Sequence, residues 1–455
     1  MNILSEKKIL FAIFFLAFLA RIGLIMFFDD NHLLFHNADS AEYLALAENI
    51  GLGRGFSWDS VEPFRPNSFR TPIYPGFLFL AEFLFGSYQA ALAIQSVLIV
   101  LSAYLLYLIG KEYFSRKIAF WSAGIFLFTP FSINVSVKFL TQTLFLSLLI
   151  LSIWCWIQFF KSQRNKYFLL TSILLPILAL TRPIAQYLPF IFILSLAYSA
   201  YFKQMNLNLK QFLKLGFIMC AVFAIVLTPW LIRNYNLLGY FRISSITPYQ
   251  LYFYDVPDAY ALANNISYGE ASNILKAEID HLWINDLRSR LSTGSKIYDF
   301  QDYMGFASGD ILISRSRHYF SAFPAYFFIS RIKNMTKFFL RDGIRYWYND
   351  FSRGSRSDIN IYKIITLKEK NIFPYLVVIE RLFLAALLIG LILSALYFFK
   401  ENAMTKSILF FFFLLLMYFS FFSGIMASAG FRIVVEPIFI LAGLNGLNKL
   451  FKYGK

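Results

Sequence analysis

The sequence predicts an all-α polytopic membrane protein, and three observations support this fold class. Hydrophobic residues make up 58% of the 455-residue chain and charged residues only 15%, a balance that lipid-facing helices require and a soluble core does not. Apolar stretches long enough to cross a bilayer recur along the chain. The breaks between them alternate between short connectors rich in Lys and Arg and breaks that hold long polar segments or compact Arg-Pro signals.

The basic connectors predict the topology, because positive loops are retained on the cytoplasmic side. They lie at Lys111–Lys117, Lys161–Lys166, Lys203–Lys214, Lys400–Lys406 and Lys449–Lys455. About ten spans of about 20 residues are then expected, at 8–28, 88–110, 118–137, 139–160, 167–181, 184–202, 214–232, 376–399, 407–427 and 431–448. An even number of crossings in the cell (inner) membrane places both termini in the cytoplasm.

The net charge of +16 lies mostly in these connectors and in the C-terminal tail. It therefore indicates retention on the cytoplasmic side and contact with anionic lipid, and no nucleic-acid partner is expected. Asp29 and Asp30 directly follow the first span, which favours an uncleaved anchor over a signal peptide. Cys155 and Cys220 both lie inside apolar spans, so a disulfide is not expected.

Three domains follow from the spans. Residues 1–232 form an N-terminal transmembrane module whose first outer loop covers 29–87. Residues 233–375 form an extracytoplasmic region, and residues 376–455 form the C-terminal transmembrane helices. A connection as long as 233–375 predicts structure of its own.

Two parts of the outer regions have a recognisable pattern. The segment Tyr254–Gly309 predicts a small α-rich domain, and His318–Tyr348, in which aromatic and basic residues alternate, predicts amphipathic helices at the membrane surface. The apolar stretch Ile73–Gly86 is too short to span, and counting it would reverse every later loop. An interfacial helix is expected there.

Candidate catalytic residues lie in the first outer loop. Asp39 and Glu42 are three residues apart at the start of a predicted helix over 39–50. A carboxylate pair at this position could accept a proton or hold a divalent cation. The same spacing is that of a helix cap, in which Asp39 accepts a free N–H and Glu42 reaches back. The two roles can coexist.

Candidate anion-binding residues are arginines at the predicted outer ends of the spans. Arg70 stands in Arg70-Thr71-Pro72-Ile73-Tyr74-Pro75, where the prolines fix the backbone, and this suits bidentate contact with phosphate; the alternative is an arginine that extends to lipid headgroups. Arg182, between two spans with almost no loop, lies at a depth where a charge is costly and usually functional.

Two further signals have ordinary alternatives. The span end Pro229-Trp230-Leu231-Ile232-Arg233-Asn234 contains Arg233 and also Trp230, which an interfacial anchor would explain. Arg432 and Glu436 are one helical turn apart, as in a local ion pair. The sequence contains no P-loop, Rossmann glycine pattern, zinc-ligand spacing or nucleophile elbow.

These signals, taken in order along the chain, resemble the GT-C membrane glycosyltransferases. The closest branch is that of the protein O-mannosyltransferases and the lipid A aminoarabinose transferases. The resemblance covers about residues 1–235 and 376–448, and its most specific elements are Arg-Thr-Pro-Ile-Tyr-Pro and Pro-Trp-Leu-Ile-Arg-Asn. It implies a GT-C-like helix bundle and an enzyme that transfers a hexose or pentose from a polyprenyl-phosphate carrier.

The resemblance also implies site residues. Asp39 corresponds to the family's acidic residue in the first loop, which acts as the catalytic base or orients the acceptor, and Glu42 is the candidate for a second catalytic acid. Arg70, Arg182, Arg432 and, less directly, Arg233 correspond to the arginines that bind the donor phosphate. Tyr43, Tyr74 and Trp230 are expected in the substrate pocket.

The chain departs from the family pattern at two places. Many relatives have a second acid where Ser40 stands, and an acid near Thr141-Gln142-Thr143. These departures put a bound metal in doubt. No cofactor is firmly expected, and a divalent cation remains an alternative.

The expected reaction is an inverting transfer of a sugar to an acceptor hydroxyl or phosphate on a lipid, glycan or protein at the outer face of the bilayer. The sequence does not identify that acceptor. A transporter or flippase of a lipid-linked sugar is one alternative, although transporters usually carry charged residues at the midplane and show repeats. An O-antigen polymerase or ligase is another.

Overall fold

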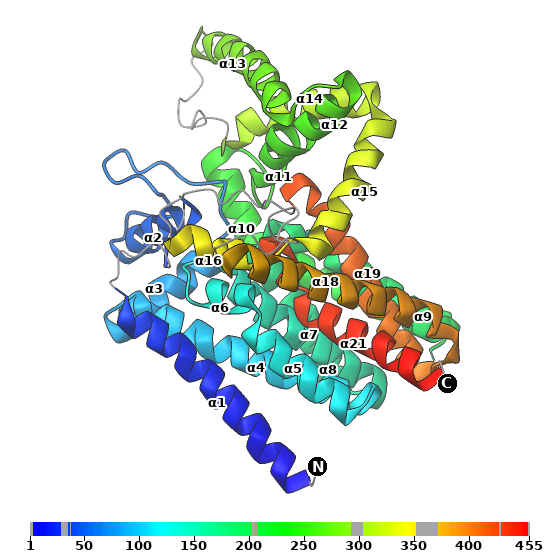
Figure 1. Cartoon of the computed structure of the whole chain (residues 1–455). Coiled ribbons are helices and arrows are strands. Elements are labelled where there is room, and N and C mark those ends of the chain that lie inside the picture. The colour runs from blue at the N-terminus through cyan, green and yellow to red at the C-terminus, as the bar shows by residue number, and fades with distance from the viewer. Residues whose placement is uncertain are drawn as a thin grey trace.

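The computed structural model describes residues 3–28, 35–36, 38–202, 205, 207–292, 304–351, 372–426 and 429–453. Within these ranges the chain forms helices and no strand, as the predicted fold class requires. Asp29 and Asp30, and parts of the region 233–375, lie outside them. A helix bundle forms the larger part of the molecule, and a smaller helical group stands above one of its ends (Figure 1).

The N-terminal part of the bundle contains ten helical segments, some of them short. They are α1 (Ile3–Phe27), α2 (Ala38–Gly51), α3 (Ile73–Phe85), α4 (Gln89–Tyr113), α5 (Arg116–Phe128), α6 (Pro130–Ser136), α7 (Thr141–Ser162), α8 (Asn165–Thr181), α9 (Leu188–Tyr201) and α10 (Leu209–Leu238). The 3₁₀ turn η1 (Pro183–Tyr187) joins α8 to α9. The helix predicted over 39–50 is confirmed as α2.

A polar contact inside the bundle holds α1 against a broken helix. Pro130 cannot donate to the preceding turn, so α5 ends and α6 begins at an angle of 57°. The fully buried Arg21 of α1 fills this break, donating to the carbonyl of Leu127 (2.8 Å) and to Ser132 (2.9 Å) and Ser136 (2.9 Å). The arginine therefore satisfies groups that the break leaves free, which offsets the cost of a charge at this depth.

The C-terminal helices pack closely through glycine. They are α18 (Ile372–Leu396), α19 (Ala403–Phe422), α20 (Ala429–Arg432) and α21 (Glu436–Tyr453), with the short turns η5 (Phe398–Lys400) and η6 (Gly424–Met426) between them. A Cβ on Gly390 of α18 would lie 2.1 Å from the carbonyl oxygen of Gly443 on α21, so only glycine permits this approach.

The predicted count of about ten spans is not confirmed. Among the described residues, seven helices are long and apolar enough to span a membrane, or eight if α5 and α6 form one broken span. The span expected at 118–137 is divided at Pro130, and the one expected at 431–448 is divided between α20 and α21, which carries three charged residues. The segments Ile73–Phe85 and Asn165–Thr181 are shorter apolar helices.

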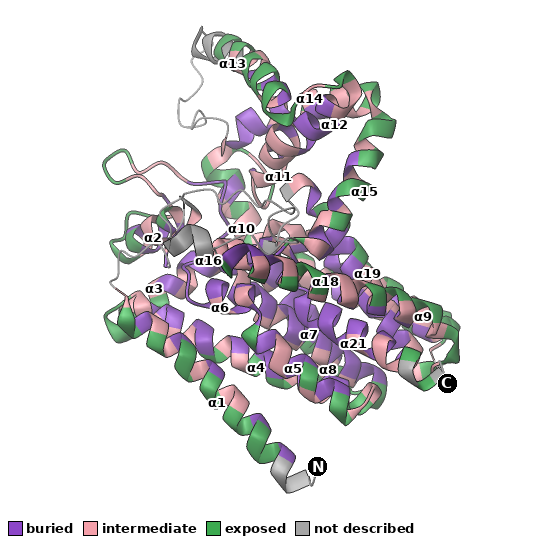
Figure 2. Ribbon diagram, viewed as in Figure 1, coloured by how far each residue is buried: buried purple, intermediate pink, exposed green. Residues whose placement is uncertain are grey.

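The smaller group contains α11 (Ile246–Gln250), the π-helical turn η2 (Leu251–Asp255), α12 (Val256–Asn264), α13 (Tyr268–Ser292) and α14 (Phe306–Ala322). It has its own apolar cluster, which includes Tyr252, Leu275 and Leu312. The helix α15 (Pro324–Leu340) descends from it to the bundle, where α16 (Ile344–Phe351) follows (Figure 1). Much of α13 is exposed, whereas buried residues concentrate inside the bundle (Figure 2).

Candidate active site

A cavity of about 290 Å³ lies where the smaller helical group meets the bundle. Its walls come from widely separated parts of the chain. They include residues of α2, the loop before α3, the start of α7, the turn η1, the segment Ile246–Asp255, the end of α19 and Phe431 of α20. Five predicted site residues line it: Asp39, Glu42, Tyr43, Arg70 and Arg182.

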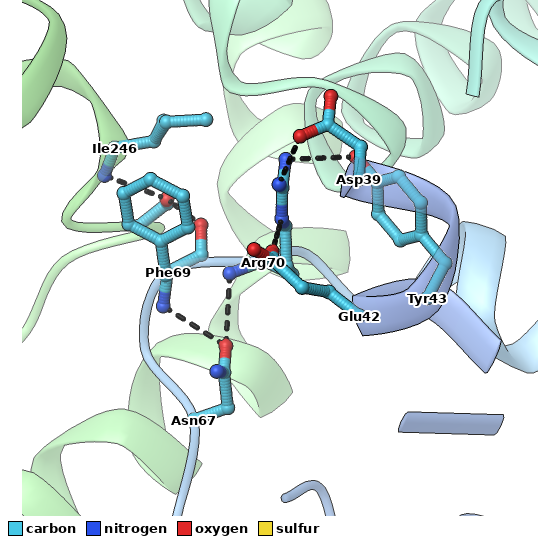
Figure 3. Close-up of polar contacts among 8 residues, drawn as sticks. Asp39, Glu42, Tyr43, Asn67, Phe69, Arg70 and Ile246 are labelled. Atoms are coloured by element: carbon cyan, nitrogen blue, oxygen red, sulfur yellow. Dashed lines mark hydrogen bonds and ion pairs between the residues drawn. The ribbon is translucent and has the colours of Figure 1, made fainter. Parts of the chain in front are cut away.

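Arg70 joins the predicted carboxylates to each other (Figure 3). Its Nε donates to Glu42 at 2.6 Å and its Nη2 donates to Asp39 at 2.7 Å. Its Nη1 donates to the Tyr43 hydroxyl at 3.1 Å. Because α2 begins at Ala38, Asp39 lies within the first turn and not at the cap position, and both carboxylates face the same guanidinium.

The loop before α3 fixes Arg70 in this position. The Asn67 side chain accepts from the backbone N–H groups of Phe69 (3.0 Å) and Arg70 (2.9 Å), which forms a tight turn (Figure 3). Thr71 donates to the carbonyl of Thr181 at 3.0 Å and so joins this loop to the end of α8.

The environment of Arg70 keeps it charged. Burial alone would lower its pKa, but Tyr43, Asp39 and Glu42 outweigh burial and raise the pKa above its ordinary value. The Arg70 side chain is 8% exposed, whereas that of Asp39 is 50% exposed. The second oxygen of Asp39 has no hydrogen bond within the described part of the chain and can therefore meet a substrate.

Arg182 has a different environment. It follows the last residue of α8, its Nη1 donates to Thr141 at 3.1 Å, and its Cζ lies 5.0 Å from the ring centroid of Phe431. None of the ion pairs found among the described residues involves it. Most of its N–H donors are thus available to an anion in the cavity.

The structure does not bring the other predicted arginines to the cavity. Arg432 is fully buried and donates to the carbonyls of Phe338 (3.3 Å), Phe339 (3.2 Å) and Arg341 (2.7 Å). Its Nε also lies 3.4 Å from Glu436, so the local ion pair is present. Arg432 of α20 therefore connects α20 to α15 and to α21. Its neighbour Phe431 does line the cavity.

Arg233 has a similar structural position. It donates to the carbonyl of Asn67 at 2.8 Å and lies 4.8 Å from the ring centroid of Trp230, which itself donates to the carbonyl of Ile243 at 2.8 Å. Tyr74 is buried beneath Tyr43, in a perpendicular ring contact of 5.1 Å. Arg233, Trp230 and Tyr74 support the cavity from outside its lining.

The segment Ile246–Asp255, here called the roof, was not predicted to belong to the site. It is held above Arg70 because Ser244 donates to the carbonyl of Phe69 (2.6 Å) and the Ser245 N–H to that of Ser68 (3.0 Å). Burial raises the pKa of Tyr249 and of Tyr254 on the roof, and nearby carboxylates add to both shifts. Both hydroxyls therefore remain hydrogen-bond donors at neutral pH.

Asp39 and Glu42 are the cavity carboxylates best placed to hold a divalent cation together, but both already contact Arg70. Within the described ranges, no three His, Cys, Asp or Glu side chains come together as a metal site would require. Gln142 contributes a neutral amide to the lining.

Comparison with known proteins agrees with this architecture. Residues 70–232 match the family model described as dolichyl-phosphate-mannose-protein mannosyltransferase. The oligosaccharyltransferase AglB from Archaeoglobus fulgidus, solved in complex with an inhibitory peptide and a dolichol-phosphate, superposes with a TM-score of 0.52 at 13% identity, over 98% of this chain and 51% of that one. The chain has the fold of the GT-C glycosyltransferases.

Two further solved structures were matched. The Archaeoglobus fulgidus oligosaccharyltransferase in complex with Zn and sulfate gives a TM-score of 0.51 at 14% identity, over 97% of this chain and 49% of that one. ArnT from Cupriavidus metallidurans, bound to undecaprenyl phosphate, gives 0.43 at 12% identity, over 97% and 78%. The chain spans about half the length of the oligosaccharyltransferases it matches. No curated protein sequence matches it.

Proposed function

We propose that this chain is an integral membrane glycosyltransferase that moves a sugar from a polyprenyl-phosphate carrier to an acceptor hydroxyl at the outer face of the membrane. The observation that carries the proposal is the meeting of Asp39 and Arg182 in one cavity. One is a carboxylate with a free oxygen, and the other is an arginine that forms no ion pair among the described residues. The GT-C fold and the dolichol-phosphate bound by AglB support a lipid-linked donor.

The chemistry assigns each group one role. The acceptor oxygen bonds to the anomeric carbon while the bond from that carbon to the phosphate oxygen breaks. The acceptor proton passes to Asp39, and the polyprenyl phosphate leaves with the electron pair. Arg182 stabilises the negative charge that develops on this leaving phosphate. Direct displacement inverts the configuration at the anomeric carbon.

Arg70 and Glu42 position the base in this scheme. Arg70 forms ion pairs with both Asp39 and Glu42, and Glu42 thereby helps to fix the guanidinium that holds Asp39. The carboxylate that receives the proton is thus oriented before the acceptor arrives. Arg182 is the one arginine without an ion pair among the described residues that line the cavity. A single such arginine suits a monophosphate carrier, whereas the alternative O-antigen polymerase or ligase would have to bind a diphosphate.

The test is sugar transfer by the purified full chain in liposomes, with synthetic polyprenyl-phosphate sugars as donors and mass spectrometry of the products. We expect Asp39→Asn to abolish transfer. The matched control is Glu48→Gln, since Glu48 is an exposed carboxylate on the same helix outside the cavity. Equal turnover by Asp39→Asn and wild type would remove Asp39 from the mechanism. Accumulation of intact donor inside sealed vesicles, with no new glycosidic bond, would favour a transporter.

Donor binding provides an independent measurement. Arg182→Ala should weaken binding of the sugar-free polyprenyl phosphate by about 10- to 100-fold, the range expected for lost hydrogen bonds to a charged group. Full affinity in this variant would refute the assignment of Arg182.

A further inference from the structure

The roof contributes one carboxylate to the cavity, Asp255, and this residue is also bound on its other side. Its Oδ2 lies 2.6 Å from Nη2 of Arg331 on α15, and its Oδ1 accepts from the backbone N–H of Ile425 at 3.3 Å. Both side chains of the ion pair are largely buried, with 11% of Arg331 and 12% of Asp255 exposed. This ion pair joins three elements that are far apart in the sequence.

Arg331 extends the connection to α19. Its Nη1 donates to the carbonyl of Phe421 at 3.2 Å, at the end of that helix. The adjoining residues Tyr418, Phe422 and Ser423 also line the cavity. The Asp255–Arg331 pair therefore links two parts of the cavity wall. Asp255 belongs to the roof, and the pair is hydrogen-bonded to the end of α19 at Phe421 and to Ile425 just after it.

Gly424 makes this close approach feasible. Its φ is +52°, and a Cβ added there would lie 2.0 Å from Oδ1 of Asp255 and 2.4 Å from Nη1 of Arg331. No other residue can occupy this position without displacing the pair. The π-helical turn η2, a form often found at functional sites, ends at Asp255.

A second carboxylate, Asp258, contacts α15 without reaching the cavity and so provides a comparison for Asp255. Asp258, one helical turn further on, also faces α15, where it accepts from Ser330 (2.5 Å) and Asn334 (3.0 Å) and lies 3.8 Å from Lys333. Asp258 does not line the cavity. It can hold α12 on α15, but it does not reach the end of α19.

We propose that Asp255 and Arg331 are positioning residues that set the distance between the roof and the end of α19, and thereby the shape of the substrate cavity. Asp255 does not act on the reacting atoms in this proposal. It fixes Tyr249 and Tyr254 on one wall relative to Tyr418 and Phe422 on the other. The inference rests on the proposed function only where substrate constants are used as the readout.

The first experiment needs no activity. Hydrogen–deuterium exchange of the full chain in nanodiscs is compared for wild type, Asp255→Asn and Asp258→Asn. Asp255→Asn should raise exchange in the peptide that covers residues 421–426, because the Ile425 N–H loses its charged acceptor. Asp258→Asn should raise exchange only in α12 and α15. Unchanged exchange at 421–426 in Asp255→Asn, or an equal rise in both variants, would overturn the proposal.

Gly424→Ala tests the same contact without removing a charge. Its matched control is Gly86→Ala, because Gly86 also has a positive φ of +69° but has nothing within 4 Å of its added Cβ. We expect Gly424→Ala to reproduce the exchange pattern of Asp255→Asn and Gly86→Ala to leave 421–426 unchanged. The proposal fails if the two glycine variants behave alike.

Substrate constants then test the consequence for the cavity. Asp255→Asn and Gly424→Ala should lower kcat/KM by about 10- to 100-fold, as small displacements of bound substrate do, and mainly through KM. A variant that lost kcat at unchanged KM would make Asp255 catalytic instead. If wild type transfers no sugar from any donor, the proposed function fails, while the exchange data still decide the positioning role.

Discussion

The ring of Phe431 lies over the guanidinium of Arg182, with 5.0 Å between the ring centroid and Cζ. The contact fixes a cation whose only hydrogen bond among the described residues is to Thr141. A buried cation–π contact is worth up to about 2 kcal/mol. Arg182 is thus oriented by a residue from the opposite end of the chain.

This contact predicts an effect on donor affinity. Phe431→Leu should weaken polyprenyl-phosphate binding by about 5- to 30-fold, the equivalent of about 1–2 kcal/mol, and Phe431→Tyr should restore most of it. Binding is measured by titration in nanodiscs. Phe439→Leu is the control, since this buried phenylalanine packs against Phe339 and does not line the cavity. Similar losses in both leucine variants would mean that packing alone explains the effect.

Arg70 should affect turnover more than donor binding. Arg70→Lys keeps the charge, but a lysine ammonium cannot reproduce the planar set of contacts to Glu42, Tyr43 and Asp39. We expect kcat to fall by about 100-fold with the donor KM nearly unchanged. Steady-state kinetics at saturating acceptor provide the measurement. A large rise in donor KM at constant kcat would show that Arg70 binds phosphate after all.

Arg432 should affect stability and not affinity. Arg432→Met removes its bonds to α15 and leaves Glu436 buried without its partner, which should lower the free energy of unfolding by about 3 kcal/mol. The measurement is Tm in detergent. Because matched apolar residues can replace a buried pair, the double variant Arg432→Met, Glu436→Leu should recover part of the loss. Reduced donor affinity in the folded fraction of Arg432→Met, with Tm unchanged, would contradict this prediction.

The connection at Asp255 should respond to pH. Burial raises the pKa of Asp255, and Arg331 opposes part of the rise; Asp258 on α12 and Tyr268 on α13 are the other ionisable groups that interact with it. As pH falls through this raised pKa, the Ile425 N–H loses its charged acceptor. The free energy of unfolding changes in the opposite direction to this local contact. The stabilisation that comes from the raised pKa of Asp255 is greatest below the ordinary aspartate pKa and is lost as pH rises through the raised pKa.

The measurement is amide exchange at Ile425, corrected for the intrinsic dependence of exchange on pH. Protection should fall on acidification at a pH above the ordinary aspartate pKa. Asp255→Asn should show no such step, because its amide does not titrate. A step of the same size in this variant would assign the transition to another group.

Much of the fold could be predicted because the hydropathy of a segment and the charges that flank it determine whether the segment enters the bilayer as a helix. The all-α class and the helix at 39–50 are confirmed. The span count could not be obtained in the same way, since Pro130 divides one apolar stretch into two bent helices that hydropathy joins. Arg21 was missed as well, although a lone arginine in an apolar stretch is a signal for a buried partner.

The cavity could be predicted only in part. Asp39 and Arg182 were found because their residue types and positions are unusual for a membrane helix bundle. The contact between Arg70 and the two carboxylates depends on how the loop before α3 folds back over α2, which no local pattern encodes. Asp255 stands in a polar and aromatic stretch without any motif, and only the packing of the roof on the bundle brings it to the site.

The cavity draws its lining from Asp39 near one end of the chain and from Phe431 near the other. During synthesis the N-terminal helices reach the bilayer well before α20 leaves the ribosome. A nascent or truncated product that lacks α20 therefore carries Asp39 and Arg182 without the Phe431 ring that orients the arginine. Under the proposed function, binding of the carrier phosphate by Arg182 therefore becomes fully effective only once α20 has been made.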